Sequence, residues 1–309
     1  ARVKAVYDQR KKLKLDEQDM QLLEDTYKGF ARSGALLEGQ DKELYREYSS
    51  ELSQLTLKFG QNAQAATNAF SYNITDPAKV EELPAFVKEG LAAEAEARGE
   101  KGWTVTLHAP SYSPFMTYST QRDIKEALYR AYNTRGIGGE TDNVENIRRI
   151  AELRLKIANL LGYKCYADYV LEDRMAESTK TVNGFLAELN KATLSYAKKD
   201  VAAITEYAHS LGFEGELAPW DFGYYNEKYK EAKYAINDEQ IKPYLQLENV
   251  KNAVFMLAGK LYGLTFTPVD NIETYHPEAT VYEVRDDKGE LMAILYLDFF
   301  PRDSKRAGA

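Results

Sequence analysis

Apolar residues spaced three and four positions apart run through most of this 309-residue chain, and this pattern constrains its fold more than any other feature. Leu44, Tyr48, Leu52, Leu55 and Phe59 are one instance. Such spacing places apolar side chains on one face of an α-helix. It predicts helices over 1–32, 41–70, 121–135, 142–160, 182–211, 221–235 and 247–262. Because only a short break around Gly34 separates the first two helices, we expect them to form an antiparallel hairpin.

Local signals add two helix starts and one non-helical segment. Asp76 followed by Pro77 predicts a helix that runs to about Gly99, since aspartate caps helix N-termini and proline is tolerated at the first helical position. Asp142, with Glu145 three residues on, resembles a capping box. The stretch HAPSYSPF at 108–115 carries two prolines, which predicts a loop or an extended segment.

Short β-prone runs interrupt the helices, mostly toward the C-terminal end. WTVTL (103–107) and LTFTPV (264–269) each predict a short strand. TVYEVR (280–285) and ELMAILYLDFF (290–300) read as two strands joined by a turn, in which Gly289 supplies the positive φ that such turns require. The predicted fold class is therefore mainly α, with long antiparallel helices and a small antiparallel β-sheet near the C-terminal end.

We expect residues 1–309 to form one continuous, mostly helical portion of a larger protein. The change from helices alone to helices with a hairpin suggests a subdivision into 1–178 and 179–309.

Composition excludes several functional classes. The formal net charge is −8 and no long basic run occurs, which argues against nucleic-acid binding and against attraction to an anionic membrane surface. No stretch approaches the ~20 apolar residues needed to span a bilayer. Cys165 is the only cysteine, so the chain forms no internal disulfide and no cysteine-based metal site.

None of the three histidines stands in a metal-binding pattern. His108, His209 and His276 each lack a second histidine four residues away, the spacing that lets one helix face hold zinc. We expect each to be a surface or hydrogen-bonded loop residue. The glycines of RGIGGE (135–140) lack the spacing of a phosphate-binding loop, and no G-x-S-x-G occurs. Residue patterns alone therefore assign no catalytic and no metal-binding residue.

An aromatic cluster surrounds Trp220 in PWDFGYYNEKY (219–229). Tyrosine combines an apolar ring with a hydroxyl that needs a partner. The cluster therefore either packs in the core or lines a wet groove that meets a ligand.

Several longer stretches together resemble one family of enzymes. These are LEDTYKGFARSGA (23–35), APWDFGYYNEK (218–228), IKPYLQLENV (241–250), YHPEATVYEV (275–284) and YLDFFPRDSKRAGA (296–309). They are similar to the thimet oligopeptidase and peptidyl-dipeptidase family of zinc metallopeptidases, and most of all to its bacterial dipeptidyl carboxypeptidase branch. The resemblance covers essentially the whole chain, and Tyr296, Asp298 and Arg302 form its most specific local element.

The resemblance implies a mostly helical fold in which two lobes flank a deep channel and a small β-sheet lies along the channel wall. It also implies hydrolysis of short peptides. In the family, an H-E-x-x-H helix and a downstream glutamate hold zinc, and the glutamate of the motif acts as general base on a zinc-bound water. This chain contains no H-E-x-x-H, so no zinc ligand can be assigned to it.

We therefore expect the chain to be the middle portion of a larger peptidase, with zinc in the parent enzyme, none in this chain, and no activity of the chain alone. In the family the zinc helix follows the segment that matches 296–309. The expected partners are short peptide substrates and the C-terminal catalytic portion of the same polypeptide, which would dock on an exposed apolar surface. The alternative is a non-catalytic helical protein-interaction module. A cytoplasmic location is expected, with the periplasm as the alternative.

The last predicted strand supplies the candidate substrate contacts. An extended peptide can add to the edge formed by 290–298 through main-chain hydrogen bonds. Alternation places Met292, Ile294, Tyr296 and Asp298 on one face, and Leu291, Ala293, Leu295 and Leu297 on the other. Because the aliphatic face suits a core, the face with Tyr296 and Asp298 is the candidate cleft face. Tyr296, Asp298 and Arg302 are thus the predicted substrate-binding residues, unless Asp298 and Arg302 form a structural ion pair.

Overall fold

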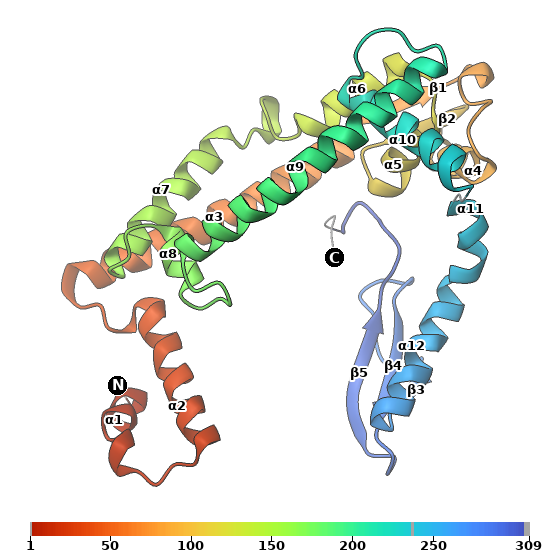
Figure 1. The fold of residues 1–309 in the computed structure, drawn as a ribbon. Helices are drawn as coiled ribbons and strands as arrows, with labels where there is room; N and C mark the ends of the chain where they lie inside the picture. The colour runs from red at the N-terminus through yellow and green to blue at the C-terminus, as the bar shows by residue number, and fades with distance from the viewer. Residues whose placement is uncertain (1, 236–237, 306–309) are drawn as a thin grey trace. The chain divides into compact units, whose positions relative to one another are not determined.

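The computed structural model describes residues 2–235 and 238–305 (Figure 1). They form two compact units, each built from two chain segments. The first unit comprises Ala1–Ala66 and Thr134–Asp200, and the second comprises Thr67–Asn133 and Val201–Ala309. The units are thus interleaved in sequence, which differs from the suggested subdivision near residue 178.

All regular elements in the described residues of the first unit are helices. Its long helices follow the predicted apolar spacing, and α3 and α9 continue into the second unit. The helices are α1 (Arg2–Asp8), α2 (Glu17–Phe30), α3 (Gly39–Ala69), α7 (Val144–Leu160), α8 (Tyr166–Leu171) and α9 (Thr179–Ser210). Helix α7 buries Ile150, Leu153 and Ile157. It is tied to α3 by Arg149, whose guanidinium donates two hydrogen bonds of 2.6 Å to the carboxylate of Glu51.

The prediction of a single helix over 1–32 was wrong. The chain breaks after a short 3-10 turn (Arg10–Lys12), and α2 starts at an aspartate cap, in which the Asp16 carboxylate accepts a hydrogen bond from the Asp19 N–H at 2.8 Å. Helix α2 packs mainly on α1, so the expected hairpin of α2 with α3 was also wrong. Gly34, at φ +78°, redirects the chain between α2 and α3, and a Cβ on this residue would lie only 2.9 Å from the ring of Tyr45.

The second unit holds the main hydrophobic core. Its elements are β1 (Ser71–Ile74), α4 (Ala85–Ala97), β2 (Trp103–Thr106), α5 (Ala109–Tyr118), α6 (Arg122–Asn133), α10 (Pro219–Tyr234), α11 (Asp238–Ile241), α12 (Leu247–Tyr262), β3 (Thr265–Pro268), β4 (Thr280–Arg285) and β5 (Leu291–Leu297). Strands β1 and β2 pair antiparallel. Their buried side chains meet those of α4, α5 and α6, with Phe115, Ile124 and Leu128 completely buried.

Two predictions between residues 76 and 118 need correction. Asp76 does accept a hydrogen bond from the Ala78 N–H, but it caps only the short 3-10 turn Pro77–Lys79, and α4 starts at Ala85, after Pro84. The stretch 108–115 is not a loop, because it forms most of α5. Pro110 sits in the first helical turn, where no N–H is needed, and the completely buried Phe115 anchors the helix in the core.

Helices α6 and α10 are joined by an ion pair between a buried carboxylate and an exposed arginine side chain. The carboxylate of Asp221, 1% exposed, accepts two hydrogen bonds of 3.0 Å from the guanidinium of Arg122 and caps the start of α10 through the Ala218 N–H. The aromatic cluster lies beside this pair, and its rings contact aromatic rings from other parts of the unit: Trp220 meets Tyr129 of α6, and Tyr225 meets Phe213. These contacts favour the packing interpretation of the cluster.

The C-terminal sheet confirms the predicted antiparallel strands. Its order is β3-β4-β5, with Val281 opposite Tyr296 and Tyr282 opposite Leu295. Gly289, at φ +80°, closes the turn between β4 and β5. Leu295 therefore faces the same side as Tyr282, against which Phe255 of α12 packs. The fold class is mainly α with small antiparallel sheets, as predicted, and none of the helices in the described ranges is long and apolar enough to cross a membrane.

Candidate functional site

The three predicted substrate-binding residues lie close together at the end of β5. Tyr296 is in the strand, Asp298 follows it directly, and Arg302 lies in the loop beyond. Tyr296 is 41% exposed, and its ring stacks on that of Tyr275 at a centroid distance of 6.3 Å. Its hydroxyl reaches the main-chain carbonyl of Glu273 at 3.4 Å. The strand end therefore presents two neighbouring phenol rings to solvent.

The carboxylate of Asp298 is fully engaged within the chain. Arg302 donates from Nη1 and Nη2 to the two carboxylate oxygens at 2.9 and 2.8 Å. Tyr275 donates its hydroxyl at 3.0 Å, and the Lys305 ammonium lies 3.1 Å away. These donors, Arg302 first among them, hold the pKa of Asp298 well below its usual range. The hydrogen bond from the Tyr275 hydroxyl to Asp298 also raises the pKa of Tyr275, because the carboxylate stabilises the protonated phenol.

In this geometry Asp298 stabilises the loop that follows β5. Its side chain is only 9% exposed, and Lys305 also donates to the carbonyls of Asp298 and Phe300 at 2.7 and 2.9 Å. The cluster thus fixes the loop that follows β5. The ion pair between Asp298 and Arg302, one of the two alternatives from sequence, is present, while substrate contact by Tyr296, Asp298 and Arg302 stays a prediction. Residues 306–309 of the quoted C-terminal stretch lie outside the described residues.

Sequence reasoning missed Tyr275 and Lys305. Tyr275 belongs to a stretch that carried the family resemblance, but its contact with Asp298 spans 23 residues and depends on the pairing of β4 with β5. Lys305 lies in the charged stretch after the strand, where composition alone gives no partner.

Strand β5 forms an edge of its sheet. One side pairs with β4, and no other described strand pairs with the opposite side. Met292, Ile294 and Tyr296 are all exposed along its candidate cleft face. An extended peptide could therefore reach both the main-chain groups and this face of β5.

A small cavity adjoins the loop that Asp298 holds. It has a volume of about 210 Å³ and lies between α4, the start of α5 and residues 301–303. His108 lines it, with Nε2 3.8 Å from a carboxylate oxygen of Asp303 and without a hydrogen-bond partner among the described residues. The cavity thus offers one imidazole, with which no other described side chain forms a hydrogen bond through Nε2.

The described histidines do not assemble a metal site. His209 lies 2.9 Å from the carbonyl of Gly215, and His276 accepts from the Glu278 N–H at 3.3 Å. Within 2–235 and 238–305, no three side chains of His, Cys, Asp or Glu stand close enough together to hold a metal ion. These residues therefore do not fit the ligand set of a catalytic zinc.

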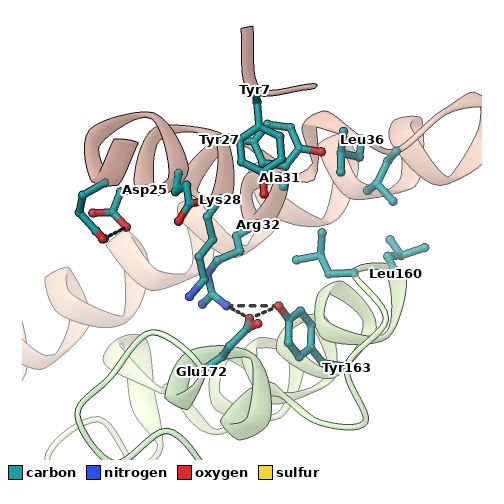
Figure 2. Close-up of a pocket in the computed structure, with 14 residues that line it drawn as sticks. Tyr7, Asp25, Tyr27, Lys28, Ala31, Arg32, Leu36, Leu160, Tyr163 and Glu172 are labelled. Atoms are coloured by element: carbon teal, nitrogen blue, oxygen red, sulfur yellow. Dashed lines mark hydrogen bonds and ion pairs between the residues drawn. The ribbon is translucent and has the colours of Figure 1, made fainter. Parts of the chain in front are cut away.

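A cavity of the first unit has a volume of about 690 Å³ (Figure 2). At its polar end, Arg32 donates to Glu172 and to the hydroxyl of Tyr163, and its Nη2 donates to the Tyr169 carbonyl at 2.6 Å. Hydrogen bonding from Tyr163 lowers the pKa of Glu172. Figure 2 shows Arg32, which lies just after α2, reaching toward Glu172 and Tyr163. Because its guanidinium is engaged on both sides, Arg32 joins the two segments of this unit and offers little to a charged ligand.

Comparisons with known proteins agree on one family. The profile of peptidase family M3 matches residues 115–309. Oligopeptidase A of Salmonella typhimurium is 34% identical over 93% of this chain and 43% of its own length. Dipeptidyl carboxypeptidase of Escherichia coli is 32% identical over 100% of this chain and 46% of its own length. The probable cytosolic oligopeptidase A of Arabidopsis thaliana is 34% identical over 96% of this chain and 44% of its own length.

These values do not single out the dipeptidyl carboxypeptidase branch that the sequence favoured, because oligopeptidases match equally well. The chain spans less than half the length of the curated relatives it matches. The resemblance to the thimet oligopeptidase and peptidyl-dipeptidase family is confirmed, and the chain belongs to peptidase family M3.

Proposed function

We propose that this chain is a portion of a larger, zinc-dependent peptidase that hydrolyses short peptides. It supplies channel wall and the substrate-facing sheet, while another part of the same polypeptide supplies the zinc ligands. Membership of the family supports peptide hydrolysis. The chain matches only 43–46% of the relatives' lengths, which supports the placement of the zinc ligands in another part of the polypeptide. We place the enzyme in the cytoplasm, because the Arabidopsis relative is named a probable cytosolic oligopeptidase.

The observation that carries this proposal is the exposed edge of β5. A substrate peptide pairs with its main chain, and Tyr296 contacts a substrate side chain on the cleft face. Main-chain pairing does not depend on side-chain sequence, which suits an enzyme that accepts many short peptides. Asp298 and Arg302 contribute to substrate binding indirectly, because their mutual hydrogen bonds hold the end of β5 in place.

The chain alone serves as the first test. It should bind no stoichiometric zinc and cleave no peptide, because the described residues offer no ligand set. Metal analysis of the purified chain and incubation with short peptides, read by mass spectrometry, measure both. Tightly held zinc with histidine ligands in this chain would refute the assignment of the zinc site to another part of the polypeptide.

The parent gene supplies the second test, and it also distinguishes the non-catalytic interaction module. A peptidase requires an H-E-x-x-H motif in the reading frame downstream of the codon for Ala309. If the longer reading frame lacks that motif, the interaction module becomes the better assignment. If it has the motif, Tyr296→Ala in the longer protein should raise KM for peptides more than it lowers kcat, because a contact shared by ground and transition states is lost.

A further inference from the structure

Helix α12 carries apolar side chains on two different sides. On one side, Phe255 stacks on Phe266 at a centroid distance of 4.2 Å and meets Tyr282 edge-on at 5.0 Å. Lys251 completes this side, with its Nζ 5.6 Å from the centre of the Tyr282 ring. This side of α12 is therefore covered by β3 and β4 (Figure 1).

The second side is an aliphatic stripe that the described chain leaves open. It consists of Leu247, Val250, Val254, Leu257 and Leu261. Val254, Leu257 and Leu261 are 57%, 54% and 63% exposed, although they were the residues that predicted this helix from sequence. Successive helical residues turn by about 100°, so the centre of the stripe lies roughly a third of a turn from Phe255. The sheet cannot cover both sides at once.

The spacing of the stripe indicates what kind of surface it fits. Its members are separated by three, four, three and four residues, which is the repeat of a coiled-coil seam. The seam is wholly aliphatic, and Ala253 and Ala258 beside it leave room for the close approach of a second helix. A wholly aliphatic seam without polar members suits a permanent interface better than a transient one.

We propose that this stripe is the docking surface for an amphipathic helix from the remainder of the polypeptide, packed on α12 along the coiled-coil seam. The inference rests on the proposed function, in which the chain is part of a longer peptidase. Its independent support is that each cited relative is more than twice as long as the stretch it shares with this chain. A helix with an aliphatic stripe of about four turns is the occupant that the spacing requires.

The test pairs the chain with the portion of Escherichia coli dipeptidyl carboxypeptidase that carries the family's zinc motif. The two are co-expressed, and the amount recovered on a tag attached to this chain is measured. Val254→Glu places a charge in the middle of the stripe. Asn252→Glu places the same charge on the opposite side of the same helix, where the side chain is also exposed, and is the matched control. Circular dichroism and urea unfolding verify that both variants fold.

We expect the wild-type chain and Asn252→Glu to recover similar amounts, and Val254→Glu to recover at least about tenfold less. Equal recovery with the two variants, or no recovery with the wild-type chain, overturns the proposal. Sedimentation of the chain alone tests whether a second copy occupies the stripe: a dimer that Val254→Glu abolishes also overturns the proposal.

Zinc content and peptide cleavage of the complex test the proposed function separately. A stripe-dependent complex without activity refutes only that function, whereas an active complex indifferent to Val254→Glu refutes only the docking surface.

Discussion

Lys125 is a buried lysine without an ion-pair partner, and replacing it by methionine should stabilise the second unit. The residue lies in α6 and is 2% exposed. No described carboxylate forms an ion pair with it, since the nearby Asp221 is engaged by Arg122, and its Nζ lies 4.9 Å from the centre of the Tyr224 ring. Burial lowers the pKa of Lys125 to about 8 from the ordinary value of 10.5.

The pKa gives the magnitude of the effect. A shift of about 2.5 units corresponds to about 3 kcal/mol against the charged amine in the folded state at neutral pH. The contact with Tyr224 offsets about 1 kcal/mol, which methionine would lose. Lys125→Met keeps the length of the side chain and removes the charge. We therefore expect its free energy of unfolding at pH 7 to exceed that of the wild-type chain by about 2 kcal/mol.

The pH dependence gives a second readout with a definite sign. Between pH 8 and 10.5 the unfolded chain holds a proton on Lys125 that the folded chain has lost, so this residue makes the wild-type chain more stable as the pH rises through that range. The variant should lack this rise. The advantage of Lys125→Met should therefore be largest below pH 8 and shrink above it.

Urea unfolding followed by tryptophan fluorescence measures this directly, because both tryptophans, Trp103 and Trp220, lie in the second unit. The control is Lys101→Met, which removes the same charge from an exposed position in that unit. If Lys125→Met is no more stable than the control at pH 7, or if both show the same pH dependence, the charged amine is not penalised by burial and the reasoning is wrong.

Two further predictions concern the loop after β5 and the turn after α2. Asp298→Asn should free residues 299–305, seen as faster amide exchange there. In the wild-type chain this protection should start to decline as the pH falls below about 4 and be lost only well below that, because the pKa of Asp298 is lowered in the folded state. Unchanged exchange would contradict this. Gly34→Ala should destabilise the first unit by about 1–2 kcal/mol in thermal unfolding, since its φ is +78° and a Cβ would lie 2.9 Å from the ring of Tyr45. Gly29→Ala, in a helix with open space around its Cβ position, should not be destabilising, and equal effects of the two changes would refute the strain at Gly34.

Local patterns predicted those parts of the fold that depend on neighbours in sequence. The apolar spacing from Leu247 to Tyr262 predicted the bounds of α12 as they are observed, and alternation predicted which face of β5 turns toward Tyr282. The pattern could not tell that the stripe on α12 would be left open, because periodicity identifies an apolar face and not what covers it. The helix at 109–118 was missed because the burial of Phe115 outweighs the local effect of two prolines.

In the candidate site, too, the features set by neighbours in sequence were predicted and those set by long-range contacts were not. Tyr296, Asp298 and Arg302 were predicted as a group because they lie in one short stretch that resembles the family. Tyr275 was missed because strand pairing brings it to Asp298, and pairing is a long-range property. The burial of Lys125 was missed for a related reason, since it depends on the packing of α6 against α10.

The interleaving of the two units has a consequence for synthesis on the ribosome. The first unit needs residues up to Asp200, but residues 67–133 of the second unit are made in between. At about 5–20 residues per second, the segment 1–66 waits roughly 7–27 s for its partner segment 134–200. Until α7 has been synthesised, Glu51 of α3 lacks Arg149, its partner in the folded unit. The first unit can therefore close only after translation has passed residue 200.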